Sequence, residues 1–210
     1  MDLTDPRPEF GKYTMEENNL PDNPLVFFKN WFKQAEKEQV SLPNAMVLST
    51  VGEQGKPSSR VVLLKEIQPN GNLVFYTNYQ SRKGDEIGKN RFVALNFFWH
   101  EQERQVRIEG MAEKTSVEDS DRYFRSRPME SRISALLSPQ SRVITDFYEL
   151  KRDILELLKE KKDIQRPWNW GGYMVTPEYF EFWQGGKNRL HDRIRYVFQN
   201  GKWDKARLAP

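Results

Sequence analysis

The chain has 210 residues and a formal net charge of +3, from 33 basic and 30 acidic side chains. This length suffices for one large domain or two small ones with a sizeable core. Cysteine is absent, which excludes a disulfide scaffold, thiol catalysis and a cysteine-ligated metal, while the charge excess is too small to indicate nucleic-acid binding on its own.

The first 23 residues are polar and rich in proline, asparagine and glutamate. This composition predicts a mobile arm with little regular structure, a candidate lid, in front of a single domain over residues 24–210. The first residues lack the basic and apolar blocks of a signal peptide, and no apolar run approaches the roughly 20 residues that a membrane helix needs. We therefore expect a cytoplasmic protein.

The first predicted helix begins at Pro24, which suits a first helical turn, and runs to about Gln39. Its apolar face is expected to consist of Leu25, Phe28, Phe32 and Ala35. Five short segments follow that are rich in β-branched or aromatic residues and bounded by turn residues, a pattern that predicts antiparallel hairpins. These strands are expected at 45–51, 59–67, 73–78, 92–99 and 105–112, with a short helix over 81–89.

The middle of the chain is predicted to be helical, over 116–126, 131–137 and 143–161. Ser116 and Asp119 have the spacing of a capping box at the start of the first of these helices, which Pro128 ends. The apolar face of the last helix is expected to contain Val143, Phe147, Leu150, Ile154 and Leu157.

Strand patterns return after the helices, at 172–175, 179–184, 194–199 and 202–207. Asn200-Gly201 is a strong hairpin signal between the last two. Strands, then helices, then strands again predict the α+β class with an antiparallel barrel rather than alternating βαβ units.

Four pairs of basic residues lie beside predicted strand ends or helix starts, where a phosphate group can be bound. A single pair of this kind is more often a solvated surface feature than a binding site. The pairs are Arg60 with Lys65, Arg82 with Lys83, Arg125 with Arg127, and Arg189 with Arg193.

Strand parity constrains the first pair, because residues five apart point to opposite faces of a regular strand. Arg60 and Lys65 are therefore expected to serve two different ligand groups, or one site bridged between subunits. The apolar residues 61–64 between them are typical of a strand that is covered on both faces.

The two histidines differ in their surroundings. His191 follows a glycine pair and lies among Arg189, Asp192 and Arg193, which is typical of a site loop, whereas His100 ends a predicted strand. With no cysteine and one candidate histidine, no transition-metal site is expected. Nucleotide-binding glycine loops and a GxSxG nucleophile elbow are absent from the sequence.

An ordered set of motifs from about Arg7 to the last residue resembles the pyridoxamine 5'-phosphate oxidase family. No single motif is specific, but the whole set in this order is. The motifs are Arg60–Lys65, Phe75–Asn78, Ser81–Lys83, Glu103–Val106, Tyr123–Pro128, Ser138–Ser141, Trp168–Gly172, Glu181–Gly186, Arg189–Arg193 and Arg207–Pro210.

The resemblance implies an FMN-binding split barrel and a homodimer with FMN at the subunit interface. The implied activity is oxidation of pyridoxamine and pyridoxine 5'-phosphates to pyridoxal 5'-phosphate, by hydride transfer from the substrate C4' to flavin N5, with O2 as acceptor and H2O2 released. The implied FMN-binding residues are Arg60, Val61, Val62, Leu63, Leu64, Lys65, Tyr76, Thr77, Arg82, Lys83, Gln105, Gln140, Ser141, Trp183 and Arg193.

The implied substrate site includes two residues, Arg189 and His191, that are also expected to act in catalysis. In the arm, Phe10 stands where family members often have tyrosine, so a hydroxyl is lost there, and Pro8 stiffens the segment. The implied substrate-binding residues are Arg7, Phe10, Lys65, Tyr123, Arg127, Ser131, Arg189, Leu190 and His191.

Three other functions are compatible with parts of this pattern. One is a split-barrel flavoprotein with another substrate, and the second is a non-catalytic carrier of FMN or pyridoxal phosphate. The third is a basic nucleic-acid module with stacking aromatic residues. The substrate set and the Arg189–His191 loop argue against the first two, and the small net charge argues against the third.

Overall fold

A computed structural model describes residues 10–16, 20–160 and 162–210 of the chain. The chain divides into two compact units, each built from separate stretches of sequence. Unit 1 contains Met1–Leu48, Ala94–Gly110 and Pro177–Pro210, and unit 2 contains Ser49–Val93 and Met111–Thr176. No helix among the described residues is both long and apolar enough to cross a lipid bilayer.

Helix α1, Pro24–Lys37, begins as predicted, because the Asn23 side chain accepts a hydrogen bond from Leu25 N and Pro24 occupies the first turn. The predicted apolar face is only partly right. Phe28 and Ala35 are buried, but Phe27 and Trp31 are buried in place of Leu25 and Phe32, so the face is rotated around the helix.

Strands β1 (Ala45–Val51) and β4 (Leu73–Asn78) have the predicted bounds. The predicted strand over 59–67 is instead two strands, β2 (Pro57–Leu63) and the two-residue β3 (Glu66–Ile67). The chain is irregular at Leu64 and Lys65, where Lys65 N donates to Val74 O. This break changes where the neighbouring side chains point.

Helix α2, Arg82–Lys89, follows β4 and begins at Ser81, whose hydroxyl caps Gly84 N. Gly84 allows the first turn to lie close to the preceding chain: a Cβ atom at this position would lie 2.2 Å from Tyr79 O. Any side chain there would push the first turn, and with it Lys83, away from its place.

Strands β5 (Phe92–Trp99) and β6 (Arg104–Lys114) were both predicted, the second two residues longer than expected at its C-terminal end. Their alternating burial places Leu95, Phe97, Val106 and Ile108 in the core. The hydrogen-bonded order of the main sheet is β2-β1-β5-β6-β7-β4-β3.

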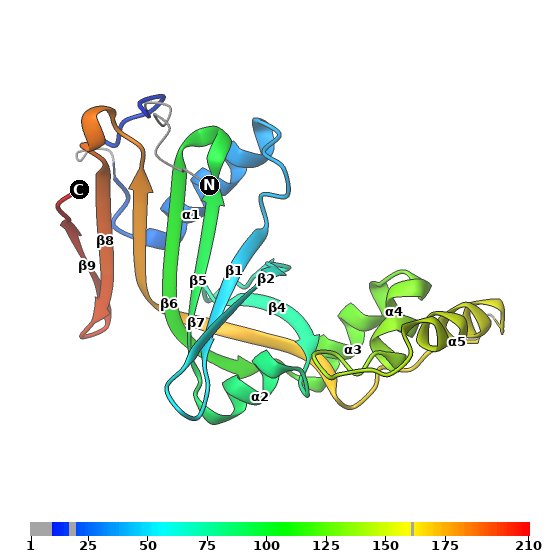
Figure 1. Ribbon diagram of the computed structural model, residues 1–210. Helices are drawn as coiled ribbons and strands as arrows, with labels where there is room; N and C mark the ends of the chain where they lie inside the picture. The colour runs from blue at the N-terminus through cyan, green and yellow to red at the C-terminus, as the bar shows by residue number, and fades with distance from the viewer. Residues whose placement is uncertain (1–9, 17–19, 161) are drawn as a thin grey trace. The chain divides into compact units, whose positions relative to one another are not determined.

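Helices α3 (Val117–Ser126), α4 (Met129–Leu137) and α5 (Phe147–Glu160) lie together in unit 2 (Figure 1). Ser116 caps α3 as predicted, with its hydroxyl accepting from Asp119 N at 3.0 Å. The shared core of this part of the unit is formed by Phe124, Ile133, Ile164 and Trp170, and Ile154 and Leu157 of α5 pack against it.

The predicted start of the last helix is wrong. Asp146 Oδ1 accepts hydrogen bonds from Tyr148 N and Glu149 N, so Asp146 caps the N-terminus of α5, which begins at Phe147. Val143 lies outside the helix and is 98% exposed, and Phe147 is also exposed, so neither belongs to the packed face.

Strand β7, Trp170–Gln184, replaces two predicted strands with one. Its residues 170–175 pair with β4 and its residues 179–184 pair with β8. The strand changes partner around Pro177, which has no N–H to donate, and the sequence suggested a break at this point. Strands β8 (Asp192–Gln199) and β9 (Lys202–Arg207) form the predicted hairpin.

The hairpin turn and the arm complete the fold. Asn200 and Gly201 both have positive φ, 52° and 78°, as the predicted tight turn requires. The expected mobile arm lies partly outside the described residues, and the described residues 10–16 and 20–23 contain no helix or strand.

Candidate functional site

A cavity of about 640 Å³ in unit 2 gathers many of the residues expected to bind ligands. Four cationic side chains line it, and none of the described residues in its wall is acidic. Such a wall attracts anions, and phosphate groups in particular. The lining residues are Arg60, Val61, Val62, Leu63, Lys65, Tyr76, Thr77, Lys83, Tyr123, Arg127, Pro128, Ser131, Gln140 and Trp170.

Arg60 and Lys65 both line this cavity, so the two residues are not separated in space as opposite strand faces would require, and the expectation that they serve two different ligand groups stays a prediction. Opposite faces require a regular strand, whereas β2 ends at Leu63 and the irregular residues after it reset the side-chain alternation. The expectation that residues 61–64 are covered on both faces is wrong: Val61 is 66% exposed and only Leu64 is buried.

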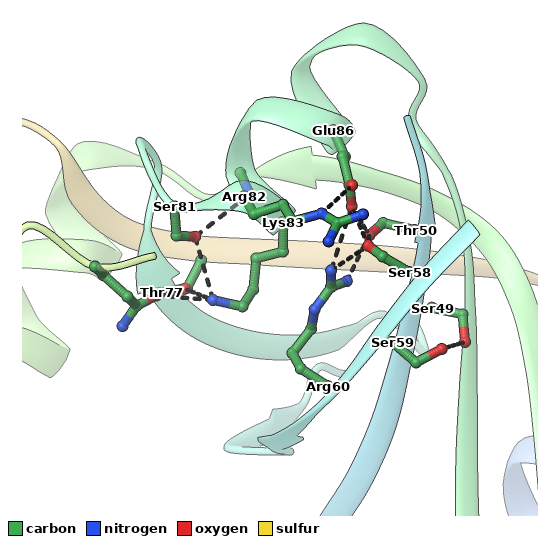
Figure 2. Close-up of polar contacts among 12 residues, drawn as sticks. Ser49, Thr50, Ser58, Ser59, Arg60, Thr77, Ser81, Arg82, Lys83 and Glu86 are labelled. Atoms are coloured by element: carbon green, nitrogen blue, oxygen red, sulfur yellow. Dashed lines mark hydrogen bonds and ion pairs between the residues drawn. The ribbon is translucent and has the colours of Figure 1, made fainter. Parts of the chain in front are cut away.

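Lys83 is a buried cation in the cavity wall, only 8% exposed. Its Nζ donates to Gln140 Oε1 at 2.7 Å, Thr77 Oγ1 at 3.1 Å and Ser81 Oγ at 3.2 Å, all of which are neutral (Figure 2). Burial, and secondarily the nearby Arg60, lowers the pKa of Lys83 to about 8. A buried ammonium without a carboxylate among its described partners is suited to an anionic ligand.

A second group of residues in the cavity wall contains stacked aromatic rings. The Tyr76 and Tyr123 rings stack with centroids 3.8 Å apart, and Trp170 stacks 5.7 Å from Tyr76. The Arg127 guanidinium lies 4.6 Å from the Trp170 ring centroid. Arg127 Nη1 is buried with no hydrogen-bond partner in the described part of the chain, and burial lowers the Arg127 pKa. This donor is free for a ligand oxygen.

Arg82 and Ser141 line a different cavity, of about 380 Å³. Its three cations are each paired with a carboxylate: Arg82 with Glu86 at 2.9 Å, Lys89 with Glu53 at 2.6 Å and Arg142 with Asp85 at 2.9 Å. The structure therefore divides the predicted cofactor residues of unit 2 between a cationic cavity and a charge-balanced one.

In unit 1, the rings of Phe10, Trp183 and His191 lie together. Phe10 packs edge-on against Trp183 at 5.6 Å and against His191 at 5.9 Å between centroids. His191 Nδ1 accepts a hydrogen bond from Gly186 N at 3.1 Å, so a neutral His191 carries its hydrogen on Nε2. The carboxylate of Glu103 accepts from Gly11 N and Lys12 N and holds the arm residues next to Phe10.

The other predicted residues of unit 1 are less closely grouped. Arg193 faces Trp183 across β7 and β8 and donates twice to Glu181 Oε1, at 3.0 and 2.9 Å. Gln105 is half-buried on β6, whereas Arg189 and Leu190 are exposed on the loop before β8. Arg7 and Pro8 lie outside the described residues.

Comparison with known proteins identifies the family. The family model described as pyridoxamine 5'-phosphate oxidase matches residues 32–159, and the model described as pyridoxine 5'-phosphate oxidase C-terminal dimerisation region matches residues 170–210. The chain belongs to the pyridoxamine 5'-phosphate oxidase family. It is therefore an enzyme of the oxidoreductase class.

Relatives named pyridoxine/pyridoxamine 5'-phosphate oxidase extend over the whole chain. One from Legionella pneumophila (strain Paris) is 49% identical over 99% of this chain and 97% of its own length. One from Bacteroides fragilis (strain YCH46) is 48% identical, over 97% of this chain and 88% of its own.

Solved structures confirm the predicted FMN-binding split-barrel fold, class α+β. The crystal structure of PhzG from Burkholderia lata 383 in complex with tetrahydrophenazine-1-carboxylic acid has a TM-score of 0.91 and 28% identity, covering 95% of this chain and 99% of that one. A pyridoxamine 5'-phosphate oxidase-related, FMN-binding protein from Nostoc punctiforme has a TM-score of 0.71 at 15% identity, covering 91% and 100%, and shows the fold alone.

Three residues that the sequence reasoning gave no role stand out within this family fold. Trp170 supports Arg127 and Tyr76 in the cavity wall. The buried carboxylates of Glu86 and Glu181 each contact an arginine that the family resemblance assigns to the cofactor, Arg60 and Arg193 respectively. Trp170 and Glu181 lie in family motifs, Trp168–Gly172 and Glu181–Gly186, which could have drawn attention to them, but nothing in the sequence distinguishes Glu86 from the other acidic residues.

Proposed function

We propose that this protein is an FMN-dependent oxidase that converts pyridoxamine and pyridoxine 5'-phosphates to pyridoxal 5'-phosphate, with O2 as electron acceptor and H2O2 released. With the amine substrate, hydrolysis by water also releases the nitrogen as ammonia. The observation that carries this proposal is the cavity with four cations and no acidic residue in its described wall. The full-length relatives of the same name support the substrate assignment.

The residues of unit 2 fit FMN. Within the described part of the chain the hydrogen-bond partners of the buried Lys83 ammonium are all neutral, and Arg60 lies in the same wall, so a phosphate group would supply a negative charge there. We assign Arg60–Lys65, Tyr76, Thr77, Lys83 and Gln140 to FMN in this cavity, and Arg82 and Ser141 from the neighbouring one. When bound, FMN supplies the redox chemistry, taking a hydride from substrate C4' at N5 and passing the electrons to O2.

The substrate phosphate is assigned to the second cationic group of the cavity. Arg127 offers a buried Nη1 with no partner among the described residues, and Lys65, Tyr123 and Ser131 line the same space. Charged donors at this end would anchor the phosphate away from the reacting carbon and so fix the orientation of the pyridine ring.

The unit 1 residues are assigned to the pyridine ring and to the flavin. His191 would donate from Nε2, because its Nδ1 is already an acceptor for Gly186 N. Arg189 would contact the reacting end of the substrate, with Leu190 and the arm residues Arg7 and Phe10 closing over the ring. Trp183, Gln105 and Arg193 complete the flavin set, with Arg193 held in place by Glu181.

A homodimer with FMN at the subunit interface belongs to the same proposal. It is supported by the match of residues 170–210 to the C-terminal dimerisation region of the family. Those residues include Trp183 and Arg193 from the flavin set and Arg189 and His191 from the substrate set.

The similarity to PhzG favours a second candidate substrate class, a partly reduced tricyclic carboxylic acid. A turnover assay distinguishes the two. Purified protein supplied with FMN should release equal amounts of aldehyde and peroxide from pyridoxamine or pyridoxine 5'-phosphate. Oxidation of the tricyclic acid with no turnover of either vitamin phosphate would replace our proposal with the second candidate.

FMN affinity should depend on pH through Lys83. Its folded pKa of about 8 lies below the ordinary lysine pKa of 10.5, so the apoprotein loses this charge as the pH rises through 8. Above pH 8 the FMN dissociation constant should rise by about ten-fold per pH unit, because binding then requires proton uptake. The same shift should make the free energy of unfolding of the apoprotein rise as the pH increases from 8 to 10.5, because in this range the unfolded chain binds a proton that the folded chain has lost. Flavin fluorescence titrations, with riboflavin as the phosphate-free control, measure the affinity.

Arg189→Ala should lower kcat by about 100-fold and leave FMN binding unchanged. The exposed side chain of Arg189 makes no hydrogen bond within the described residues, so its removal should cost little stability. Steady-state kinetics and a flavin titration on the same preparation test both halves of the prediction. An equal loss of flavin affinity would contradict the assignment of Arg189 to the substrate.

A further inference from the structure

Glu86 is a buried carboxylate on α2 that lies behind the wall of the cationic cavity rather than in it. Its side chain is 10% exposed. Glu86 Oε2 accepts hydrogen bonds from Thr50 Oγ1, from Ser58 Oγ at 2.6 Å and from Arg60 Nη2 at 3.2 Å (Figure 2). Oε1 accepts from Arg82 Nε at 2.9 Å. One carboxylate therefore joins β1, β2 and α2.

The two hydroxyl groups form bridges between Arg60 and Glu86. Arg60 Nη1 donates to Thr50 Oγ1 and Arg60 Nη2 donates to Ser58 Oγ, each at 2.5 Å. Each hydroxyl in turn donates its one hydrogen to Glu86. Arg60 is thus held by one direct contact and two bridged contacts, which fix the plane of its guanidinium group.

Glu86 keeps its negative charge at neutral pH. Burial alone would raise the pKa of Glu86, but the hydrogen bonds from Ser58, Thr50, Arg82 and Arg60 outweigh it and hold the pKa at about 2. Arg60 and Lys83 are both cations and repel each other, and this repulsion adds to the larger effect of burial in lowering the pKa of Lys83. A fixed negative charge behind Arg60 opposes that repulsion.

We infer that Glu86 is a positioning residue for the cofactor, which holds the Arg60 guanidinium in the cavity wall for flavin binding. The inference rests on the proposed function, because the family resemblance assigns Arg60 to FMN. Thr50 and Ser58 are the two bridges through which Glu86 acts. Glu86 does not line the cavity that Arg60 lines. It lines the neighbouring cavity, where it is paired with Arg82, so toward Arg60 it acts from behind the cavity wall and not as a lining residue.

Glu86→Gln distinguishes positioning from simple electrostatics, because the two predict changes of opposite sign in the FMN dissociation constant. Removing a negative charge beside the cavity should, by charge alone, tighten the binding of an anion. Positioning predicts the reverse, since an amide places a donor against either Arg82 or the bridged Arg60 group. We expect the FMN dissociation constant of the apoprotein, from fluorescence quenching, to rise about ten-fold, equivalent to ~1.4 kcal/mol. Unchanged or tighter binding would overturn the inference.

Two further variants show whether the effect passes through Arg60. In an Arg60→Gln background, Glu86→Gln should weaken FMN binding by less than about two-fold, because the group to be positioned is gone. A full ten-fold effect in that background would assign the loss to general damage and overturn the inference. Should Glu86→Gln fail to fold, Ser58→Ala removes one bridge. It should weaken FMN binding by about three-fold, and no change would count against the inference.

The matched control is Glu113→Gln, which removes a carboxylate that is 50% exposed and paired with Arg91 in the same unit. It changes the charge of the unit by the same amount and does not contact Arg60, so FMN affinity should stay within about two-fold. If the unmodified protein binds no FMN, the proposed function fails. If it binds FMN and Glu86→Gln binds equally well, only the positioning role fails.

Discussion

Replacing Lys83 by methionine is expected to weaken FMN binding by about 100-fold, or ~2.7 kcal/mol. Lys83 is 8% exposed, and its ammonium group donates to neutral oxygen atoms of Thr77, Ser81 and Gln140. A bound phosphate group would therefore place a negative charge next to this ammonium group. Methionine has a side chain of similar volume but no charge.

The same substitution should not destabilise the apoprotein. A buried charge without a charged partner costs free energy, so Lys83→Met is expected to raise the melting temperature of the flavin-free protein near pH 7. Lys89→Met on the same helix is the control, because Lys89 is exposed and paired with Glu53. Equal FMN affinities of the two variants would show that Lys83 does not contact the phosphate.

Replacing Arg127 by alanine is expected to raise the KM for pyridoxamine 5'-phosphate by about 100-fold, with little change in FMN affinity. Arg127 Nη1 is buried and unpartnered among the described residues, and the Trp170 ring holds the guanidinium in place. A substrate phosphate would thus find a pre-positioned, partly desolvated donor, and the cost of ordering that side chain is already met within the protein.

Arg125→Ala is the control for this prediction. Arg125 is exposed on α3, two residues from Arg127, and does not line the cavity. Its removal should leave KM within about two-fold. A similar KM increase in both variants would indicate a general electrostatic attraction, and an unchanged KM in Arg127→Ala would remove Arg127 from the substrate site.

The local structure of this chain is largely readable from its sequence. Turn residues and alternating apolar side chains placed β1, β4 and β9 at their observed bounds, and the caps at Ser81 and Ser116 mark where α2 and α3 begin. These are signals between residues close in the chain. The class α+β follows from their order alone.

Features that depend on partners distant in the sequence were not readable. The break between β2 and β3 lets Arg60 and Lys65 share a cavity, and it depends on how Lys65 pairs with Val74. The continuity of β7 through Pro177 depends on its two successive partner strands. In the same way, the role of Glu86 on α2 depends on Thr50 of β1 and Ser58 of β2, which are distant from it in the sequence.

Among the candidate residues, the family motifs found the cavity wall and its cations but not the residues behind them. Chemical character and motif order point to a side chain that meets a ligand, such as Lys83 or Arg127. A supporting side chain, such as Glu86, is defined by what it contacts and has no such signal. The ligand roles of the predicted site residues stay predictions, and Gln105, Arg189 and Leu190 are also absent from the lining of the cationic cavity.

The most direct test of two phosphate-binding groups in one cationic cavity is anaerobic reduction of the bound flavin. Protein loaded with FMN is mixed with pyridoxine 5'-phosphate or with pyridoxine, and the flavin absorbance is followed without O2. We predict that the phosphorylated substrate bleaches the flavin at concentrations about 100-fold lower than pyridoxine. Bleaching at equal concentrations of the two, or by neither, would contradict the account.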